Sequence, residues 1–314
     1  MKTNTKIDKK TEKILVIGAN GFLGSCLMNY KYLSTFQLRG VSLIAGDLNY
    51  SHLSQNILFY KIDITNAKKI ERKILEIDPQ VIILSASMTD VDQCEIDKNL
   101  ATKINIEGPK NVIKVCKKIA SKLVFLSTDF IFDGTKENGL YKEKDIPNPL
   151  NHYAKTKYEA EKLIRNSELN YLICRTSVLY GWNKWKLNFV TWIIEQLKQN
   201  KNISIVMNQI NSPTYTENLA QIIFKLIEKE AKGVYHTAGD CVLSRYEIAL
   251  KTAEIFGYNR NLIKPITNLK QKAIRPENVS LDITKLKSII GSELKILNLE
   301  EGLCRMNEER NNKK

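Results

Sequence analysis

The chain has 314 residues, of which 43% are apolar and 26% are charged, and its formal net charge is +14. This length is enough for one large α/β domain, or for one domain with a smaller appendage. The composition excludes a disordered chain, and no apolar run is long enough to cross a bilayer. Residues 1–6 lack the apolar core of a secretory signal, so we expect a cytoplasmic protein without a membrane partner.

The surplus of positive charge indicates a nucleic-acid partner only if the basic residues cluster. The lysines are spread over the whole chain instead, and no basic stretch alternates with aromatic residues as a stacking platform would. We therefore predict no nucleic-acid partner. The six cysteines and three histidines form no Cys-x-x-Cys pair and no cluster with zinc spacing, so we expect free thiols and no metal site.

The first predicted element is a buried parallel strand over 14–17, which follows a lead of residues 1–11 that we expect to be disordered. The strand runs into a Gly-x-x-Gly-x-x-Gly loop, and a helix is predicted over 25–30. Such a loop permits a tight turn, lets the backbone approach a pyrophosphate, and places the positive end of a helix dipole beside the phosphates. We predict dinucleotide contacts from the loop residues Gly18, Asn20, Gly21, Phe22, Leu23 and Gly24.

The next two predicted strands, 41–45 and 60–64, are each associated with an acidic residue. Asp47 lies where an acidic side chain can hydrogen-bond the adenosine ribose, and its charge would favour NAD over NADP. The alternative is that Asp47 is only a turn residue, so NADP and NAD both stay open as cofactors. We predict that Asp63 faces the adenine edge of the cofactor, with Ile64 also in contact.

Short apolar strands continue to alternate with helices as far as residue 176. Further strands are predicted at 81–84, 123–126 and 171–174, and helices at 65–78 and 97–120. This alternation is typical of a doubly wound parallel α/β sheet, the Rossmann fold, which we place over 12–176. Ligands bind beyond the carboxyl ends of such strands, and small residues after the fourth strand let a cofactor pass close: Ser85, Ala86 and Ser87.

After residue 176 the alternation stops. We expect 177–306 to form a smaller, mixed C-terminal lobe with interleaved segments, which covers the cofactor cleft and sets substrate specificity. We expect 307–314 to be a frayed polar tail. The predicted helices of the lobe are 189–199, 217–230, 244–256 and 299–306, and its predicted strands are 203–206 and 234–237.

A tyrosine and a lysine carry the predicted chemistry. Tyr153 and Lys157 are four residues apart in a helix, so both lie on one face. We expect the ammonium of Lys157 to lower the pKa of the Tyr153 hydroxyl. An acid of this kind suits protonation of the alkoxide that forms when hydride adds to a carbonyl. Two other Tyr-x-x-x-Lys pairs occur, but only this pair lies in the first turn of the helix that follows the fifth strand.

The residues at the end of the fifth strand complete the predicted site. Ser127 is expected to contact the cofactor, and Thr128 to orient the substrate oxygen. Asp129 would bind a substrate hydroxyl or relay the proton. Lys157 would also hydrogen-bond the nicotinamide ribose, which holds the hydride donor against the ketone carbon.

Nine motifs in a fixed order give the chain a family resemblance. They are 18–24, 89–95, 105–109, 126–134, 147–157, 175–177, 188–190, 212–214 and 275–282. With them the chain resembles the extended short-chain dehydrogenases/reductases, and most of all the dTDP-4-dehydrorhamnose reductase (RmlD-like) group. The resemblance implies NAD(P)H-dependent reduction of the 4-keto group of a nucleotide-linked 6-deoxysugar, in the synthesis of cell-surface polysaccharide sugars. A homodimer is one assembly compatible with it.

The resemblance also implies roles for individual residues. It places Thr128, Asp129, Tyr153 and Lys157 at the catalytic centre. It implies substrate contacts from Thr89, Asp129, Phe130, Asn188 and Arg275. The chain departs from the family pattern at 85–89, 130, 178 and 208, mostly where substrate is expected. The resemblance therefore predicts the reductase chemistry more firmly than it predicts rhamnose as the product.

Two alternatives stay open. The chain also resembles the regulatory beta subunit of methionine adenosyltransferase, which binds a dinucleotide while serving another enzyme. The presence of both Tyr153 and Lys157 argues mildly against this reading. A dehydratase or epimerase of the same superfamily is the other alternative. A sugar-nucleotide dehydratase needs a further acid/base residue after Asp129, where this chain has Phe130, which cannot move a proton.

Overall fold

The computed structural model describes residues 12–29, 41–49, 57–183 and 187–312. A seven-stranded sheet has the strand order β11-β6-β5-β4-β1-β2-β3, and every pairing within it is parallel. In chain order the strands are β1 (Lys13–Ile17), β2 (Ser42–Asp47), β3 (Leu58–Lys61), β4 (Val81–Leu84), β5 (Lys122–Thr128), β6 (Tyr171–Thr176) and β11 (Gly233–His236). The predicted disordered lead lies outside the described residues.

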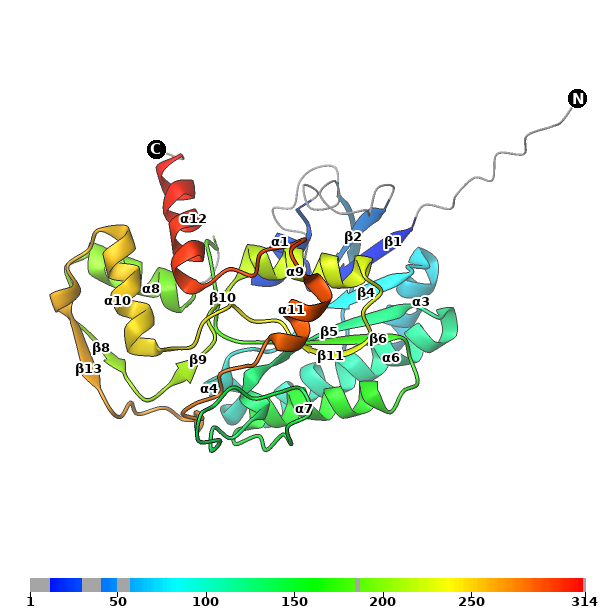
Figure 1. Ribbon diagram of the computed structural model, residues 1–314. Helices are drawn as coiled ribbons and strands as arrows, with labels where there is room; N and C mark the ends of the chain where they lie inside the picture. The colour runs from blue at the N-terminus through cyan, green and yellow to red at the C-terminus, as the bar shows by residue number, and fades with distance from the viewer. Residues whose placement is uncertain (1–11, 30–40, 50–56, 184–186, 313–314) are drawn as a thin grey trace, which may run out of the picture.

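The strands are apolar on both faces because helices cover both sides of the sheet (Figure 1). Ile14 and Val16 of β1 belong to one core, and Leu15 and Ile17 to the other, as the alternation of side chains along a strand requires. The helices of the first core are α1 (Phe22–Leu27), α9 (Thr216–Glu228) and α11 (Thr284–Ile290). Those of the second are α3 (Ala67–Ile77), α6 (Gly108–Ile119) and α7 (His152–Arg165). The predicted doubly wound sheet is confirmed.

The direction of winding reverses beside β1. The chain passes outward from β1 through β2 to β3, then returns to the other side of β1 at β4 and continues through β5 and β6. The carboxyl ends of β1 and β4 meet there, since the backbone N–H groups of Ser85 and Ala86 donate to the Ile17 carbonyl at 2.9 and 3.0 Å. Open α/β sheets bind their ligands at this point.

The strand predicted at 234–237 lies in the main sheet and not in the C-terminal lobe. Val234 and Tyr235 pair with Ile173 and Cys174 of β6, which makes β11 the edge strand. Helix α9, also predicted in the lobe, packs against α1 beneath the glycine loop. The sequence after residue 176 therefore contributes to the main sheet as well as to the smaller lobe.

Two predicted boundaries in the first half of the chain are wrong. The helix after the glycine loop is α1, which begins at Phe22 and ends at Leu27 instead of spanning 25–30. The third strand is β3, 58–61, so Asp63 and Ile64 follow it. Asp63 leaves the strand because its carboxylate accepts hydrogen bonds from the Thr65 backbone and hydroxyl, at 2.8 and 2.7 Å.

The segment between β4 and β5 is almost entirely helical, as predicted for 97–120. It also contains a helix that was not predicted, α4 (Val91–Ile96), whose first turn Asp90 caps. Then follow α5 (Lys98–Thr102), a π-helical turn (Lys103–Glu107) and α6.

The smaller lobe consists of three helices and short strand pairs around two apolar clusters. Its helices are α8 (Phe189–Lys198), α10 (Arg245–Phe256) and α12 (Leu299–Asn311). Its paired strands are β7 (Leu179–Tyr180) with β10 (Thr214–Tyr215), β9 (Ile210–Asn211) with β12 (Leu243–Ser244), and β8 (Ile203–Val206) with β13 (Ile263–Ile266). Helix α12 continues past the predicted end at 306, and the Asn307 side chain donates to the Ile255 carbonyl at 3.0 Å. The expected frayed tail is therefore wrong for residues 307–311.

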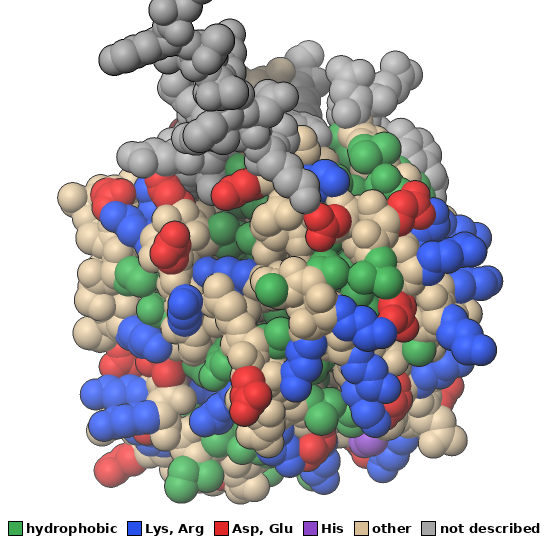
Figure 2. All heavy atoms as spheres, turned by 90° about the vertical axis from the view of Figure 1, so that its right-hand side faces the viewer, with side chains coloured by type: hydrophobic (Ala, Val, Ile, Leu, Met, Phe, Trp, Pro, Cys, Tyr) green, Lys and Arg blue, Asp and Glu red, His purple; other side chains and the backbone are tan. Residues whose placement is uncertain are grey.

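The charged side chains on the face drawn in Figure 2 do not form a single basic stripe, because Lys and Arg are interspersed with Asp and Glu. The six cysteines are free thiols. In the described part of the chain, no helix combines the length and the apolar composition that crossing a membrane requires.

Candidate active site

The glycine loop fits tightly against the carboxyl end of β4. Gly18 has a φ of +89°, and a Cβ atom at this position would lie 2.5 Å from the backbone nitrogen of Ala86. A Cβ atom on Gly24, in the first turns of α1, would collide with the Gly18 carbonyl. Two of the three glycines are thus required by close backbone packing, as the sequence pattern predicts.

Asp47 connects the end of β2 to the glycine loop. Its Oδ2 atom accepts a hydrogen bond from the Asn20 backbone N–H at 2.9 Å, and its Oδ1 atom accepts one from the Leu48 backbone N–H at 2.7 Å. The Asn20 side chain in turn donates to the Asn49 carbonyl. The carboxylate therefore lies beside the loop, and its predicted contact with the adenosine ribose stays a prediction.

The small residues after β4 are also held in place. The Ser85 hydroxyl donates to the Ile17 carbonyl at 2.9 Å. The Ser87 hydroxyl donates to the Asn105 side chain at 2.9 Å, and Asn105 donates to the Thr156 hydroxyl of α7 at 3.1 Å. Asn105, which lies in one of the nine motifs but was assigned no role, links the end of β4 to α7, the helix that carries Tyr153 and Lys157.

Lys157 points toward Ser87 and is nearly enclosed. Its side-chain nitrogen lies 3.5 Å from the Ser87 hydroxyl and 4.2 Å from the ring centroid of Phe125. Burial lowers the pKa of Lys157 to about 7, although the charge of Glu161 opposes this shift. Lys157 therefore lies at the sheet edge where the cofactor was predicted.

Tyr153 points toward the end of β5. Burial of the hydroxyl raises the pKa of Tyr153 above its ordinary value, and the charge of Asp129 adds to the increase, while a hydrogen bond with Thr128 opposes it. The Lys157 side chain is directed at Ser87, and the net shift of the Tyr153 pKa is upward. The prediction that Lys157 lowers the pKa of Tyr153 is therefore wrong for this structure.

Asp129 is the most connected of the predicted catalytic residues. Its Oδ2 atom accepts hydrogen bonds from the Ser177 hydroxyl at 2.5 Å and the Asn211 side chain at 3.2 Å, and its Oδ1 atom accepts one from Thr128 at 3.0 Å. Burial raises the pKa of Asp129 to about 6, and these hydrogen bonds limit the increase. The sequence alone indicates no role for Ser177 or Asn211, although Ser177 lies in the motif 175–177 and Asn211 directly precedes the motif 212–214.

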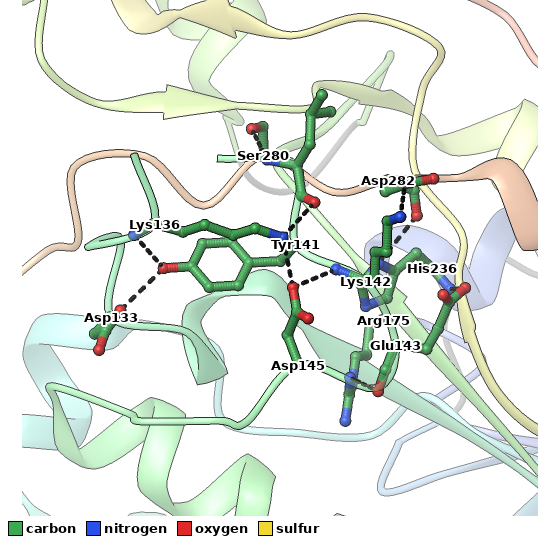
Figure 3. A network of polar contacts seen from close by, with 11 residues as sticks. Asp133, Lys136, Tyr141, Lys142, Glu143, Asp145, Arg175, His236, Ser280 and Asp282 are labelled. Carbon is green, nitrogen blue, oxygen red and sulfur yellow. Dashed lines mark hydrogen bonds and ion pairs between the residues drawn. The ribbon is translucent and has the colours of Figure 1, made fainter. Parts of the chain in front are cut away.

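A polar network holds the loop that precedes α7 (Figure 3). Asp133 accepts hydrogen bonds from the Tyr141 hydroxyl and the Asn148 side chain, both at 2.9 Å. The Tyr141 backbone N–H donates to the Ser280 carbonyl at 2.8 Å. Arg175, buried beside this loop, donates to the Glu143 carbonyl at 3.2 Å. This network helps to set where α7, and with it Tyr153, begins.

The residues predicted to contact substrate have different surroundings. Thr89 is exposed, and Phe130 is partly buried against the first core. Ser127, which was predicted to contact the cofactor, is buried at the end of β5. Asn188 caps α8 and donates to the Gly181 carbonyl at 2.7 Å. Arg275 forms an ion pair with Asp92 at 3.2 Å. The structure thus brings Thr128, Asp129 and Tyr153 together, whereas Asn188 is engaged in local capping.

Two surface cavities, of about 220 and 460 Å³, contain none of the predicted site residues. The first is lined in part by Asp240 and Lys287, and the second by Asp133 and Ile146. The candidate site lies instead at the carboxyl edge of the sheet, where the predicted side chains converge and where open α/β sheets bind their ligands.

Comparison with known proteins identifies the family of the chain. The family model described as RmlD substrate binding domain matches residues 12–309. A dTDP-4-dehydrorhamnose reductase from Aggregatibacter actinomycetemcomitans is 30% identical over 292 residues, which cover 89% of this chain and 93% of that protein. The methionine adenosyltransferase 2 subunit beta of Bos taurus is 28% identical over 292 residues, covering 90% of this chain and 84% of that protein.

A solved dTDP-4-dehydrorhamnose reductase structure has a similar fold. The crystal structure of dTDP-4-dehydrorhamnose reductase from Bacillus anthracis in complex with NADP matches with a TM-score of 0.83 and 32% identity, and it covers 96% of this chain and 100% of that one. The family model and the reductases agree over nearly the whole chain, including both the glycine loop and the smaller lobe. The chain therefore belongs to the RmlD substrate binding domain family of extended short-chain dehydrogenases/reductases.

Proposed function

We propose that the protein is an NAD(P)H-dependent reductase that acts on the 4-keto group of a nucleotide-linked 6-deoxysugar. One observation carries this proposal: Thr128, Asp129 and Tyr153 converge at the end of β5, next to the Lys157 and Ser87 pair at the end of β4. Similarity to dTDP-4-dehydrorhamnose reductases over almost the whole chain supports it.

The residues present fit a dinucleotide. The tight turn at Gly18, the carboxylate of Asp47 beside it, and the small residues Ser85 to Ser87 leave backbone groups and short side chains along the sheet edge. The similar Bacillus anthracis reductase binds NADP. We infer that either NADPH or NADH is held by the glycine loop, Asp47 and Lys157, with Asp63, Ile64 and Ser127 as further predicted contacts.

A bound reduced nicotinamide supplies the hydride to the ketone carbon. Thr128, which interacts with Tyr153 and Asp129, orients the carbonyl oxygen. Tyr153 donates its proton to the oxygen that gains negative charge. The Tyr153 hydroxyl, whose pKa is raised, is protonated at neutral pH and so holds the proton that this step requires. Lys157 would hydrogen-bond the ribose of a bound nicotinamide and so help to hold the hydride donor in place.

We propose a supporting role for Asp129 in this scheme. Its two carboxylate oxygens already accept three hydrogen bonds from the protein, so we propose that it positions Thr128 and does not relay the proton.

Oxidation of NADH and NADPH against a panel of nucleotide-linked 4-keto-6-deoxysugars tests the proposal. We expect oxidation that depends on the keto-sugar, and a product with a new hydroxyl at carbon 4. Dinucleotide binding without oxidation on any member of the panel would instead support the regulatory alternative, for which the similarity to the methionine adenosyltransferase beta subunit is the argument.

A further inference from the structure

An arginine of the smaller lobe lies close to the proposed catalytic residues. Arg245 is the first residue of α10 and directly follows β12, in which Leu243 pairs with Asn211 of β9. The Asn211 side chain reaches Asp129, so the same strand pair brings the start of α10 to the end of β5. The Arg245 backbone N–H donates to the Gln209 carbonyl at 2.9 Å, which fixes the start of the helix.

The Arg245 side chain is partly buried, and its guanidinium group has no acceptor in the described part of the chain. Its central carbon lies 4.7 Å from the ring centroid of Phe189, so one face of the group is covered. Its Nε atom is buried without a hydrogen-bond partner. Within residues 12–29, 41–49, 57–183 and 187–312, the Arg245 guanidinium takes part in no hydrogen bond and no ion pair. The protein therefore supplies no acceptor for this planar group and its five N–H donors, which are open to a group from outside the chain.

Charge and burial make this an unusual place for an arginine. Burial lowers the pKa of Arg245 to about 10, which leaves it protonated at neutral pH, and the charges of Asp129 and Arg275 act on it in opposite directions. The other buried arginine at this edge, Arg175, is satisfied by Glu161 and by the Glu143 carbonyl. Arg275 is satisfied by Asp92 and the Ala273 carbonyl. Partial burial of a cation without a protein acceptor costs free energy, and an acceptor from outside the chain would supply the missing hydrogen bonds.

We propose that Arg245 is a substrate-binding residue whose guanidinium recognises an oxyanion group of the nucleotide-sugar substrate, with Arg275 adding to the positive potential. The identity of that ligand rests on the function proposed above. The oxyanion is either a phosphate of the diphosphate bridge or a carboxylate on the sugar, since the guanidinium fork matches the geometry of both groups. The stacking on Phe189 holds the fork in one plane and reduces the entropy lost on binding.

Calorimetric titration distinguishes a phosphate from a carboxylate as the oxyanion that Arg245 binds. The probes are thymidine 5′-diphosphate, uridine 5′-diphosphate, thymidine and D-glucuronate, titrated into the full-length wild-type protein and the variants Arg245→Ala, Arg245→Lys and Arg260→Ala. Arg260 is an exposed arginine of the same lobe, so its replacement removes one positive charge without touching the site. If the oxyanion is a phosphate, we expect Arg245→Ala to weaken diphosphate binding by about 10-fold or more, with thymidine binding unchanged. If it is a carboxylate, glucuronate binding falls instead.

Arg245→Lys keeps the charge and loses the fork, so it should retain part of the affinity and report on the site even if the alanine variant unfolds. The inference is overturned if wild type binds none of the charged probes, or if both Arg245 variants bind them as tightly as wild type and Arg260→Ala do. Its failure is distinct from failure of the proposed function. Arginine-dependent binding without keto-sugar reduction would refute the reductase alone, and reduction with Arg245-independent binding would refute this inference alone.

Discussion

The side chain of Asn211 donates a hydrogen bond to Asp129 Oδ2 at 3.2 Å. This contact joins a short strand of the smaller lobe to the end of the central strand β5, across 82 residues of sequence. Asp129 also accepts hydrogen bonds from Ser177 and Thr128. Asp129, which directly follows the proposed catalytic threonine, therefore lies at one of the contacts between the lobe and the main sheet. The geometry of the catalytic residues is therefore coupled to the packing of the lobe.

Replacing Asp129 by Asn should destabilise the protein by about 1–3 kcal/mol at neutral pH, because an amide offers one acceptor oxygen where a carboxylate serves three donors. The effect should depend on pH. The folded-state pKa of Asp129 is about 6 against an ordinary 3.8, so the folded protein holds this proton more tightly. The contribution of Asp129 to the free energy of unfolding therefore falls as pH rises through this window.

Urea unfolding of wild type and the Asp129→Asn variant at about pH 4 and about pH 6.5 measures this difference. We expect the stability advantage of wild type to shrink at the higher pH. An advantage that stays constant or grows would show that the carboxyl does not have a raised pKa in the folded protein.

The buried ion pair of Arg175 and Glu161 should contribute strongly to folding. The two side chains are 1% and 0% exposed and lie 2.7 Å apart. Glu161→Gln leaves the Arg175 charge buried without its counter-ion, and we expect a loss of about 3–5 kcal/mol. Glu76→Gln, which breaks the exposed pair with Lys73, is the matched control and should cost about 0.5 kcal/mol or less. Equal losses of unfolding free energy in the two variants would contradict this account.

Much of the fold was predictable because its signals are local. The central strands β1 and β4 are short apolar runs, and both faces of β1 are buried, so no alternation with polar residues obscures it. The placement of β11 was not predictable in this way. Val234 and Tyr235 look like any short strand, and only their pairing with β6 shows that they belong to the main sheet.

The candidate site was predictable in its residues but not in its contacts. The four-residue spacing of Tyr153 and Lys157 placed both side chains on one helix face, and it said nothing of their directions. In the structure the lysine is directed at Ser87, and the tyrosine is directed at Thr128. Arg245 carries no local signal, because it becomes significant only when β9 and β12 bring it near Asp129.

Lys157→Met should change the pH dependence of stability in a defined direction. The folded-state pKa of Lys157 is about 7 against an ordinary 10.5, so the folded protein binds this proton less tightly than the unfolded chain does. Stability due to Lys157 therefore rises with pH between these values. Thermal unfolding at about pH 6.5 and about pH 9 should show wild type gaining stability relative to Lys157→Met. A relative loss at the higher pH would contradict the lowered pKa.

Gly18→Ala should impair both folding and dinucleotide binding. The substitution introduces a Cβ atom 2.5 Å from the Ala86 nitrogen, in a backbone conformation with a φ of +89°. Gly257→Ala is the control. Gly257 also has a positive φ, of +72°, but a Cβ atom added there would have no atom within 4 Å, so this variant isolates the backbone strain of about 1 kcal/mol. We expect Gly18→Ala to lose more unfolding free energy than the control and to lose affinity for NADPH in fluorescence titration. Unchanged NADPH affinity in a folded Gly18→Ala protein would place the dinucleotide elsewhere.

The central claim is that the Tyr153 hydroxyl protonates the reduced carbonyl. The most direct measurement is the turnover number of keto-sugar reduction by Tyr153→Phe and by Tyr158→Phe, a control on the same helix whose ring contacts Lys162 at 5.2 Å. We predict that Tyr153→Phe lowers the turnover number about 100-fold or more with NADPH affinity unchanged, and that Tyr158→Phe reduces the sugar at the wild-type rate. Undiminished reduction by Tyr153→Phe would contradict the claim.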